Sequence, residues 1–360
     1  MKAAVLRAIK QPLTIEDVEL SKPGPHEVLI RTVAAGVCHS DLHFQNGSYV
    51  HELPAVLGHE SAGVVEQVGS EVRYVAPGDH VITCLSVFCG HCEYCLKGRP
   101  ALCEKTDTRR AADAAPRLSQ KGEVMHQFAD LSSYAEQLLV HENAVVKITK
   151  DMPLDRAALL GCGVTTGVGA VFNTAKVPAG ATVAVIGCGG VGLSAIQGAR
   201  IAGAGRIIAV DTLAAKLELA KRFGATDCVN ASEGNPVQQV RQLTGGGVEY
   251  SFEAIGLKQT AEQAFAMLEN GGTATLIGMI PLGLKIELPG AAFLNEKKIQ
   301  GSNMGSNAFR VDMPRYVDLY LQGRLNLDDL ISKRIRLDQV NEAFADLEKG
   351  SVARSVIVFP

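Results

Sequence analysis

Four of the nine cysteines lie within one segment of fifteen residues. They are Cys89, Cys92, Cys95 and Cys103. Closely spaced thiolates can surround a tetrahedral Zn²⁺ from a single loop, and a metal held by four protein ligands keeps no vacant position for a substrate. An iron–sulfur cluster also takes four thiolates, and four unrelated buried thiols are the plainest alternative. We predict a structural metal site, with zinc as the first choice.

Three further segments carry metal-ligand side chains beside glycine. They are Gly36-Val-Cys38-His39-Ser40-Asp41, Gly58-His59-Glu60 and Gly161-Cys162-Gly163. Cysteine and histidine suit zinc, and three protein ligands leave a fourth position open for chemistry. Each segment alone is ambiguous, because a single cysteine in an apolar stretch is more often a core residue than a ligand.

A glycine fingerprint indicates a nucleotide site. Gly187-Cys188-Gly189-Gly190-Val191-Gly192 follows the apolar run 181–186 and opens a helical pattern. The first glycine permits the tight turn, the second lets the backbone approach a pyrophosphate, and the third allows close packing of helix on strand. The helix N-terminus then offers N–H groups and partial positive charge to the phosphates.

The choice of cofactor depends on Asp211, which ends the next predicted strand. A carboxylate there accepts hydrogen bonds from the ribose hydroxyls and repels a 2′-phosphate. The residues that follow it, Thr212, Leu213 and Ala214, include no Arg that would accommodate that phosphate. We predict NAD rather than NADP, the alternative being a solvated aspartate at a strand end.

The bulk composition is that of a globular chain of about two domains. The 360 residues are 47% hydrophobic and 20% charged, with a net charge of −3 and no Trp, which gives no case for a nucleic-acid or membrane partner. Two charge-free stretches, 157–175 and 177–199, are long enough to span a bilayer, but they are rich in Gly and we predict buried core. With an odd number of cysteines and no export signal, we expect a cytoplasmic protein.

The pattern of elements changes along the chain. The first 150 residues indicate short strands, among them 27–33 and 63–68, and residues 104–133 indicate a long functional loop. Thereafter strands alternate with helices, which implies a parallel sheet covered on both faces. The predicted strands are 181–186, 206–210, 227–230, 250–254 and 273–277, followed near the C-terminus by 355–359. The predicted helices are 190–202, 213–223, 236–243 and 259–268.

Taken together, these motifs resemble the zinc-containing alcohol dehydrogenases of the medium-chain dehydrogenase/reductase family, from Met1 to Pro360. The resemblance rests on Gly58-His59-Glu60-x-x-Gly63-x-Val, the cysteine-rich loop and the glycine fingerprint. It implies an α/β and mostly-β two-domain fold. A Rossmann doubly wound parallel sheet would span 164–303, and a GroES-like irregular β catalytic domain with both zinc sites would span 1–163 and 304–360.

The resemblance also implies roles for individual residues near the zinc. Cys38, His59 and Cys162 would bind the catalytic zinc, with Glu60 as an alternate ligand. Asp41 would orient His59 through its other ring nitrogen. Ser40 would accept the alcohol proton, and His43 would pass it to solvent through the nicotinamide ribose. The remaining implied residues are Leu85 and Tyr134 in the substrate pocket, and His39, Thr166, Lys216, Ile277 and Arg354 at the cofactor.

Some positions depart from the family pattern. Leu257 stands where some members place an Arg near the cofactor, and His39 stands where many have Arg against the pyrophosphate. We expect His39 to loosen NADH binding. Cys84, Cys188 and Cys228 match no ligand position and are expected to pack in the core. His51 matches no role, and we expect a solvated or locally bonded side chain.

The implied activity is the reversible oxidation of zinc-bound primary alcohols, or of secondary or aromatic ones, to aldehydes or ketones by hydride transfer to NAD. A polyol or glutathione-adduct (S-hydroxymethylglutathione) dehydrogenase is the first alternative, because Arg109, Arg110 and Arg117 could contact an anionic substrate. A catalytically silent binding protein is a remote alternative. Segments 285–288 and 298–303 resemble edge strands that pair between subunits, so we expect a homodimer, with a homotetramer as the alternative.

Overall fold

The chain forms two compact units in the computed structural model, which describes residues 1–104, 107–111, 113–350 and 352–360. Unit 1 comprises Met1–Cys162 and Ala308–Pro360, and unit 2 comprises Gly163–Asn307. The sequence-based division, at residues 163 and 304, lies within a few residues of these bounds.

Unit 2 contains a six-stranded parallel sheet in the order β14-β13-β12-β15-β16-β17. This is the Rossmann order, which reverses direction beside the first strand of the unit. The fold class expected from the sequence is confirmed. The strands are β12 (Thr182–Ile186), β13 (Arg206–Asp211), β14 (Asp227–Asn230), β15 (Val248–Glu253), β16 (Leu268–Leu276) and β17 (Lys298–Gly301).

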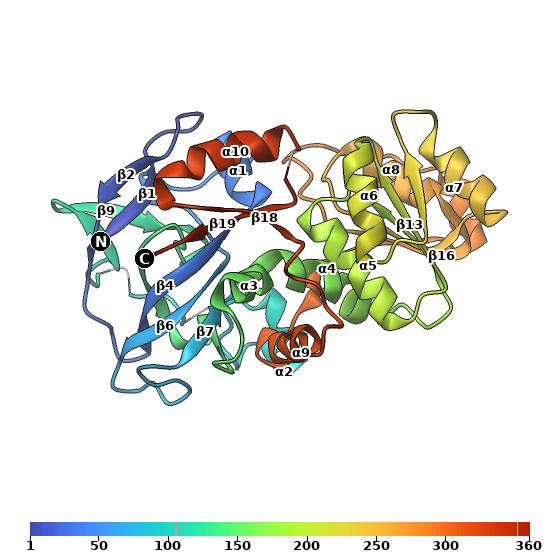
Figure 1. The fold of residues 1–360 in the computed structure, drawn as a ribbon. Coiled ribbons are helices and arrows are strands. Elements are labelled where there is room, and N and C mark those ends of the chain that lie inside the picture. The colour runs from blue at the N-terminus through green and yellow to red at the C-terminus, as the bar shows by residue number, and fades with distance from the viewer. Residues whose placement is uncertain (105–106, 112, 351) are drawn as a thin grey trace. The chain divides into compact units, whose positions relative to one another are not determined.

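Four helices connect these strands: α5 (Gly190–Ala202), α6 (Ala214–Phe223), α7 (Pro236–Thr244) and α8 (Lys258–Ala266). Helices α5 and α6 contact each other, as do α7 and α8 (Figure 1). Because crossovers between parallel strands are right-handed, the reversal of strand order places the two pairs on opposite faces. Local sequence fixes the start of α7, where the Asn235 side chain accepts from the Val237 and Gln238 amides and Pro236 occupies the first turn.

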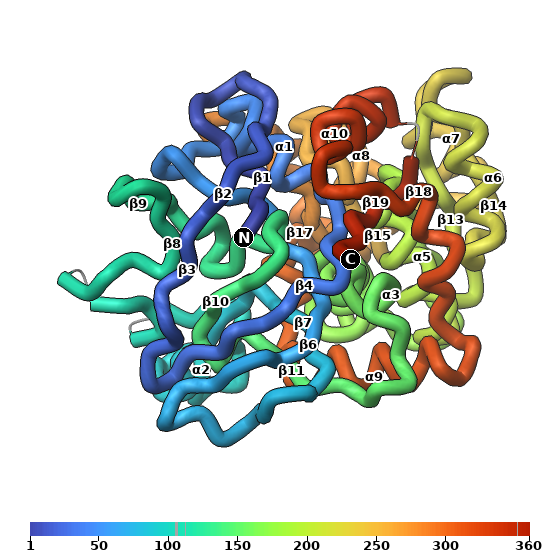
Figure 2. The backbone as a smooth tube through the Cα atoms, turned by 60° about the vertical axis from the view of Figure 1, so that its left-hand side comes forward, coloured from blue at the N-terminus to red at the C-terminus, as the bar shows by residue number. Residues whose placement is uncertain are grey.

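Unit 1 is built around β4 (Glu27–Val37), the longest strand, which pairs with β6 (Ser61–Val68), β10 (Gln137–His141) and β19 (Arg354–Val358) (Figure 2). The other strands of this sheet are β7 (His80–Thr83), β11 (Val145–Ile148) and β18 (Ile331–Ile335). Because β19 runs beside β4, residues near the C-terminus lie next to the residues that follow β4.

A second sheet in unit 1 has the order β2-β1-β5-β9-β8-β3. Its strands are β1 (Lys2–Leu6), β2 (Thr14–Asp17), β3 (Glu19–Leu20), β5 (Ala55–Val56), β8 (Leu118–Gln120) and β9 (Glu123–Gln127). The helices of this unit are α1 (His39–Gln45), α2 (Glu93–Leu96), α3 (Leu154–Leu159), α9 (Phe309–Leu321) and α10 (Val340–Glu348). Apolar side chains of β1, β4 and α10 form one of the cores of this unit.

One expectation from the sequence is wrong in detail. The segment 104–133 is not a structureless loop, because its described residues contribute β8, β9 and a 3-10 turn at Phe128–Asp130. Residues 285–288 form no strand within this chain, and their expected pairing between subunits stays a prediction.

One helix, spanning Leu154–Ala175, is long and apolar enough to cross a membrane by length and composition alone. Of its most apolar window, 83% is buried inside the protein, as in the core helix of a folded domain.

Candidate catalytic metal centre and nucleotide site

Three ligand-type side chains meet in unit 1. The Cys38 and Cys162 thiols and the His59 imidazole are all buried, and their donor atoms lie within 4.8 Å of one another. Cys38 follows β4 directly, and Cys162 lies in a turn of π-helix, Leu160–Val164. His59 follows Gly58, whose φ of +92° and close approach to the Tyr134 ring exclude other residues there. Cys38 and Cys162 are thus placed by a strand and a helical turn, whereas His59 stands on the short irregular segment between β5 and β6.

Asp41 fixes the imidazole of His59. Its Oδ1 accepts from the Gly58 amide at 3.0 Å and lies 3.1 Å from Nδ1 of His59, and its Oδ2 accepts from the Tyr134 hydroxyl at 2.7 Å. The other ring nitrogen, Nε2 of His59, is buried and has no hydrogen-bond partner among the described residues. A buried nitrogen without a partner is costly, so the site fits a metal ion bound at that atom.

The charges around the three donors also fit a cation. A hydrogen bond from the Cys162 thiol holds the pKa of Cys38 well below its usual range. Burial opposes a charged His59, but Asp41 and Cys38 outweigh it and raise its pKa well above the usual value. This concentration of negative charge suits Zn²⁺ with two thiolates and one imidazole.

Glu60 and Arg354 form a buried pair beside the thiols. Arg354 Nη1 lies 3.4 Å from Oε2 of Glu60 and donates to the Val37 carbonyl at 3.3 Å. Both side chains are at most 5% exposed. In this arrangement the Glu60 carboxylate faces Arg354, so its role as an alternate ligand and the Arg354 pyrophosphate contact stay predictions.

The predicted proton relay lies at the start of α1. Ser40 Oγ is 3.7 Å from the Cys38 sulfur, one turn before His43. Burial lowers the pKa of His43, and its Nδ1 has no hydrogen-bond partner within the described residues. His39 is exposed, and its ring lies 6.1 Å from that of His43.

The four clustered cysteines converge as predicted. The sulfurs of Cys89, Cys92, Cys95 and Cys103 lie within 4.8 Å of one another. Cys92 Sγ and Cys103 Sγ are 3.9 Å apart, close to the edge of about 3.8 Å expected for a tetrahedron of thiolates around zinc. The Cys89 amide donates to Cys103 Sγ at 3.1 Å, and the Cys92 amide donates to Cys89 Sγ at 3.3 Å. These amide contacts stabilise thiolates, so the cluster fits a structural zinc.

The nucleotide site in unit 2 has the predicted local geometry. Gly187 has a φ of +95°, and a Cβ on Gly192 would lie 1.7 Å from the Gly187 carbonyl oxygen. A Cβ on Gly189 would meet nothing, which leaves open space for a phosphate at the start of α5. Asp211 ends β13, where its carboxylate accepts from the Cys188 and Leu213 amides at 2.8 and 3.0 Å.

The other predicted residues lie as follows. Thr166 is buried and donates to the Met304 sulfur, while Lys216 and Ile277 are half-buried in unit 2. In unit 1, Leu85 is half-buried against the core. Tyr134 is fully buried and holds Asp41, so its predicted place in the substrate pocket is corrected to a contact behind the metal ligand.

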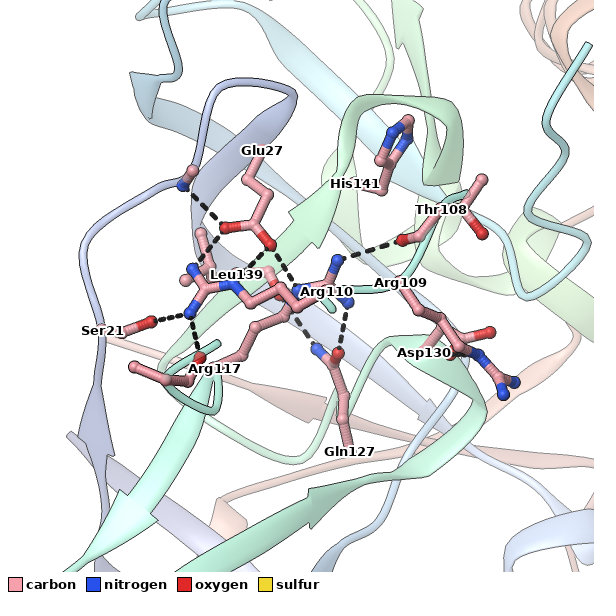
Figure 3. Close-up of polar contacts among 12 residues, drawn as sticks. Ser21, Glu27, Thr108, Arg109, Arg110, Arg117, Gln127, Asp130, Leu139 and His141 are labelled. Atoms are coloured by element: carbon pink, nitrogen blue, oxygen red, sulfur yellow. Dashed lines mark hydrogen bonds and ion pairs between the residues drawn. The ribbon is translucent and has the colours of Figure 1, made fainter. Parts of the chain in front are cut away.

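The loop arginines are already bound within the protein (Figure 3). Arg110 donates from Nε to Glu27 Oε1 at 2.9 Å, and Arg117 donates from Nε to the same oxygen at 2.7 Å. Arg109 pairs with Asp130 at 3.2 Å. Arg110 and Arg117 are therefore not free to receive an anionic substrate, contrary to the basis of the glutathione-adduct alternative.

Sequence reasoning missed two contacts of the metal site. The Tyr134 hydroxyl reaches Asp41 across 93 positions of sequence, and the Phe128 ring lies edge-on against His59 with centroids 5.9 Å apart. No local pattern signals either contact, because the partners are far apart in the sequence.

Comparisons with known proteins agree with this site. The family model for the alcohol dehydrogenase GroES-like domain matches residues 24–150, and that for zinc-binding dehydrogenases matches residues 190–322. An alcohol dehydrogenase zinc-binding domain protein from Burkholderia ambifaria shares 40% identity over 100% of this chain and 98% of its own, with a TM-score of 0.95. Benzyl alcohol dehydrogenase from Acinetobacter calcoaceticus shares 34% identity over 100% and 99%, with a TM-score of 0.94.

A more distant relative carries a nucleotide. A putative zinc-binding dehydrogenase from Sinorhizobium meliloti 1021 bound to NADP shares 28% identity over 99% of both chains, with a TM-score of 0.83. The fold and the two thiolate-rich clusters thus define a zinc-binding dehydrogenase. The chain belongs to the zinc-containing alcohol dehydrogenases of the medium-chain dehydrogenase/reductase family and is an oxidoreductase.

Proposed function

We propose that this chain is an NAD-dependent alcohol dehydrogenase that reversibly oxidises primary alcohols to aldehydes. The supporting observation is the convergence of Cys38, His59 and Cys162 beside Ser40. When bound there, Zn²⁺ would act as a Lewis acid, which can lower the pKa of a coordinated hydroxyl from about 15.7 for water to about 7.

The chain's own residues then have distinct tasks. Asp41 holds the His59 imidazole so that Nε2 meets the metal. Ser40 Oγ takes the alcohol proton, and His43 passes that proton on to solvent. Since burial lowers the pKa of His43, its imidazole is neutral near pH 7 and can accept a proton. A dinucleotide bound at the glycine fingerprint would supply the nicotinamide that accepts the hydride.

The test compares two serines at opposite ends of one short segment. Ser40→Ala removes the hydroxyl beside Cys38, whereas Ser48→Ala removes one whose partner among the described residues is Asn46. We expect Ser40→Ala to lose about 100-fold or more in kcat with two zinc ions still bound per chain, and Ser48→Ala to keep wild-type turnover. Full turnover by Ser40→Ala would remove Ser40 from the relay, and a wild-type protein without zinc would end the proposal.

The case for NAD rests on Asp211. Its buried carboxylate is held by two backbone amides at the end of β13, where it would repel a 2′-phosphate. Since the Sinorhizobium meliloti relative holds NADP, direct comparison is needed. We expect kcat/KM for NAD to exceed kcat/KM for NADP. In Asp211→Gly the ratio of these two values should fall, chiefly because the variant binds NAD more weakly. An NADP preference of the wild-type enzyme would refute this choice.

Aromatic alcohols are our first substrate candidates. The Phe128 ring packs against His59 and the Phe44 and Tyr49 rings extend this cluster, and one relative is a benzyl alcohol dehydrogenase. Such rings favour an aromatic substrate by offset and edge contacts. A panel of benzyl alcohol, butanol, 2-butanol and S-hydroxymethylglutathione, followed by NADH absorbance, distinguishes these classes. Preference for the glutathione adduct would favour a glutathione-adduct dehydrogenase, although Arg110 and Arg117 are already paired with Glu27.

We also propose a homodimer in the cytoplasm. Apolar side chains in the segment that precedes the edge strand β17 are exposed, with Leu282, Leu284 and Leu294 at 69%, 53% and 87%. An exposed apolar patch beside an open sheet edge is typical of a subunit interface. None of the nine cysteines, all of which lie in the described residues, is in a disulfide, as in proteins of a reducing compartment.

A further inference from the structure

The segment 128–132 adopts an unusual backbone beside the metal ligands. Ala129, Asp130 and Ser132 have φ angles of 54°, 60° and 63°. Left-handed conformations are costly at each such residue, because Cβ comes too close to the following carbonyl oxygen, and they persist only where the surroundings enforce them. We call this segment the left-handed turn.

The left-handed turn contacts the catalytic metal site in two ways. Its first residue, Phe128, packs edge-on against the His59 ring. The residues after it hold the backbone that leads into His59, because the Ser133 and Tyr134 amides donate to the Gly58 and Leu57 carbonyls at 2.8 and 3.0 Å. The turn and the residues that follow it therefore contact both the His59 imidazole and the backbone at Leu57 and Gly58.

Hydrogen bonds from Gln127, which is itself bound by Arg117, hold the left-handed turn in place. Gln127 Nε2 donates to the Leu131 carbonyl at 3.2 Å and the Leu139 carbonyl at 2.9 Å. Gln127 Oε1 accepts from Arg117 Nη1 at 2.9 Å, and Arg117 is bound to Glu27 (Figure 3). The Arg117 side chain is only 9% exposed, so this anchor is protected from water and from salt.

From these contacts we propose that Arg117 and Gln127 are positioning residues for the catalytic zinc. They act through the left-handed turn, which keeps His59 aligned for metal binding. The proposal rests on the proposed function, since it assumes that Cys38, His59 and Cys162 hold zinc. It gives the segment 104–133 a role in retaining the metal rather than in binding an anionic substrate.

A second ion cluster provides the matched control. Arg7 binds Glu16 and Glu123 on the surface, and so ties the same β8–β9 hairpin to the rest of unit 1. It has no contact with the left-handed turn among the interactions of the described residues. Arg7→Met therefore loosens the hairpin but keeps the hydrogen bonds of Gln127. Gln127→Met removes those hydrogen bonds and leaves Arg117 paired with Glu27.

The experiment measures zinc release from the intact protein into a chelator. The zinc at Cys89, Cys92, Cys95 and Cys103 serves as the internal reference. We expect Gln127→Met and Arg117→Met to release the catalytic zinc about 10-fold faster, at the low end of the roughly 10- to 100-fold affinity losses caused by removing a direct partner of a metal ligand. The structural zinc should leave at the wild-type rate, and Arg7→Met should match the wild type at both sites. Cobalt(II) placed in the catalytic site should show a shifted visible spectrum in Gln127→Met.

The outcomes separate the two proposals. Wild-type release rates and cobalt spectra in folded Gln127→Met would overturn the positioning role, even if Arg117→Met failed to fold. An equal acceleration in Arg7→Met would overturn it too, because general loosening would then suffice. A wild-type protein that binds only the structural zinc would instead overturn the proposed function, and this inference with it.

Discussion

Replacing Asp41 by Asn tests the metal centre with minimal change of shape. The carboxylate is fully buried and takes part in three polar contacts, with the Gly58 amide, the His59 ring and the Tyr134 hydroxyl. In the variant the amide oxygen can keep the first two partners. The amide NH₂ then faces Tyr134, whose hydroxyl can rotate to accept. Only the negative charge is lost.

The expected loss follows from that charge. A hydrogen bond to an ionised group contributes about 1.5–3 kcal/mol, against about 1 kcal/mol for a neutral one. The difference, about 0.5–2 kcal/mol, corresponds to about 2- to 30-fold in affinity. We therefore expect Asp41→Asn to bind the catalytic zinc about 10-fold more weakly and to keep the structural zinc, in line with outer-shell effects at other zinc sites.

Competition with a chromophoric chelator measures this affinity, and circular dichroism checks the fold. Asp151→Asn, which removes an exposed carboxylate, controls for the change in net charge. Tyr134→Phe removes one contact and keeps the charge, so we expect a smaller loss. If Asp41→Asn binds zinc as tightly as the wild type, the charge of Asp41 does not tune His59, and our description of the site is wrong.

Three further predictions concern stability and assembly. Burial alone would raise the pKa of Glu27, but hydrogen bonds from Arg110 and Arg117 hold this pKa at about 2. The charge of Glu27 therefore stabilises the fold above about pH 4.3, and this stabilisation is lost as the pH falls towards 2. In urea unfolding, Glu27→Gln should lower the free energy of unfolding by about 3 kcal/mol at pH 7 and by less at pH 3. A decrease that is the same at both pH values would contradict this prediction. Cys103→Ser should lose one zinc per chain and lower the thermal midpoint by at least about 5 °C in calorimetry; unchanged zinc content would exclude it as a ligand. Leu294→Glu should yield monomers in sedimentation while Leu96→Glu does not, and a Leu294→Glu dimer would place the interface elsewhere.

Local sequence patterns were sufficient for the elements whose chemistry is local. The glycine fingerprint predicted the turn from β12 into α5, since tight turns and close packing there demand glycine. The cysteine-rich loop predicted its own cluster, because its four ligands lie within one short segment. The predicted helix 213–223 differs from α6 by a single residue at its start.

Long-range pairing explains the errors. The segment 104–133 has no clear periodicity because β8 and β9 are short and pair with distant strands. Tyr134 was assigned to the pocket by its position in the family, yet its hydroxyl is bound to Asp41. The sequence also shows three arginines in one loop but not that Glu27, far upstream, neutralises two of them.

These differences have one physical cause. The ligands Cys38 and His59 follow strands, so their order and spacing carry a signal that sequence can show. Their alignment comes from contacts that cross the fold, namely Tyr134 on Asp41 and Phe128 on His59. Such contacts join residues that are distant in the sequence and meet only in the folded unit. A metal centre of this kind needs the folded unit to fix its geometry, so substitutions far from the zinc in sequence, such as those at Gln127, are the sharpest tests of how the site is held.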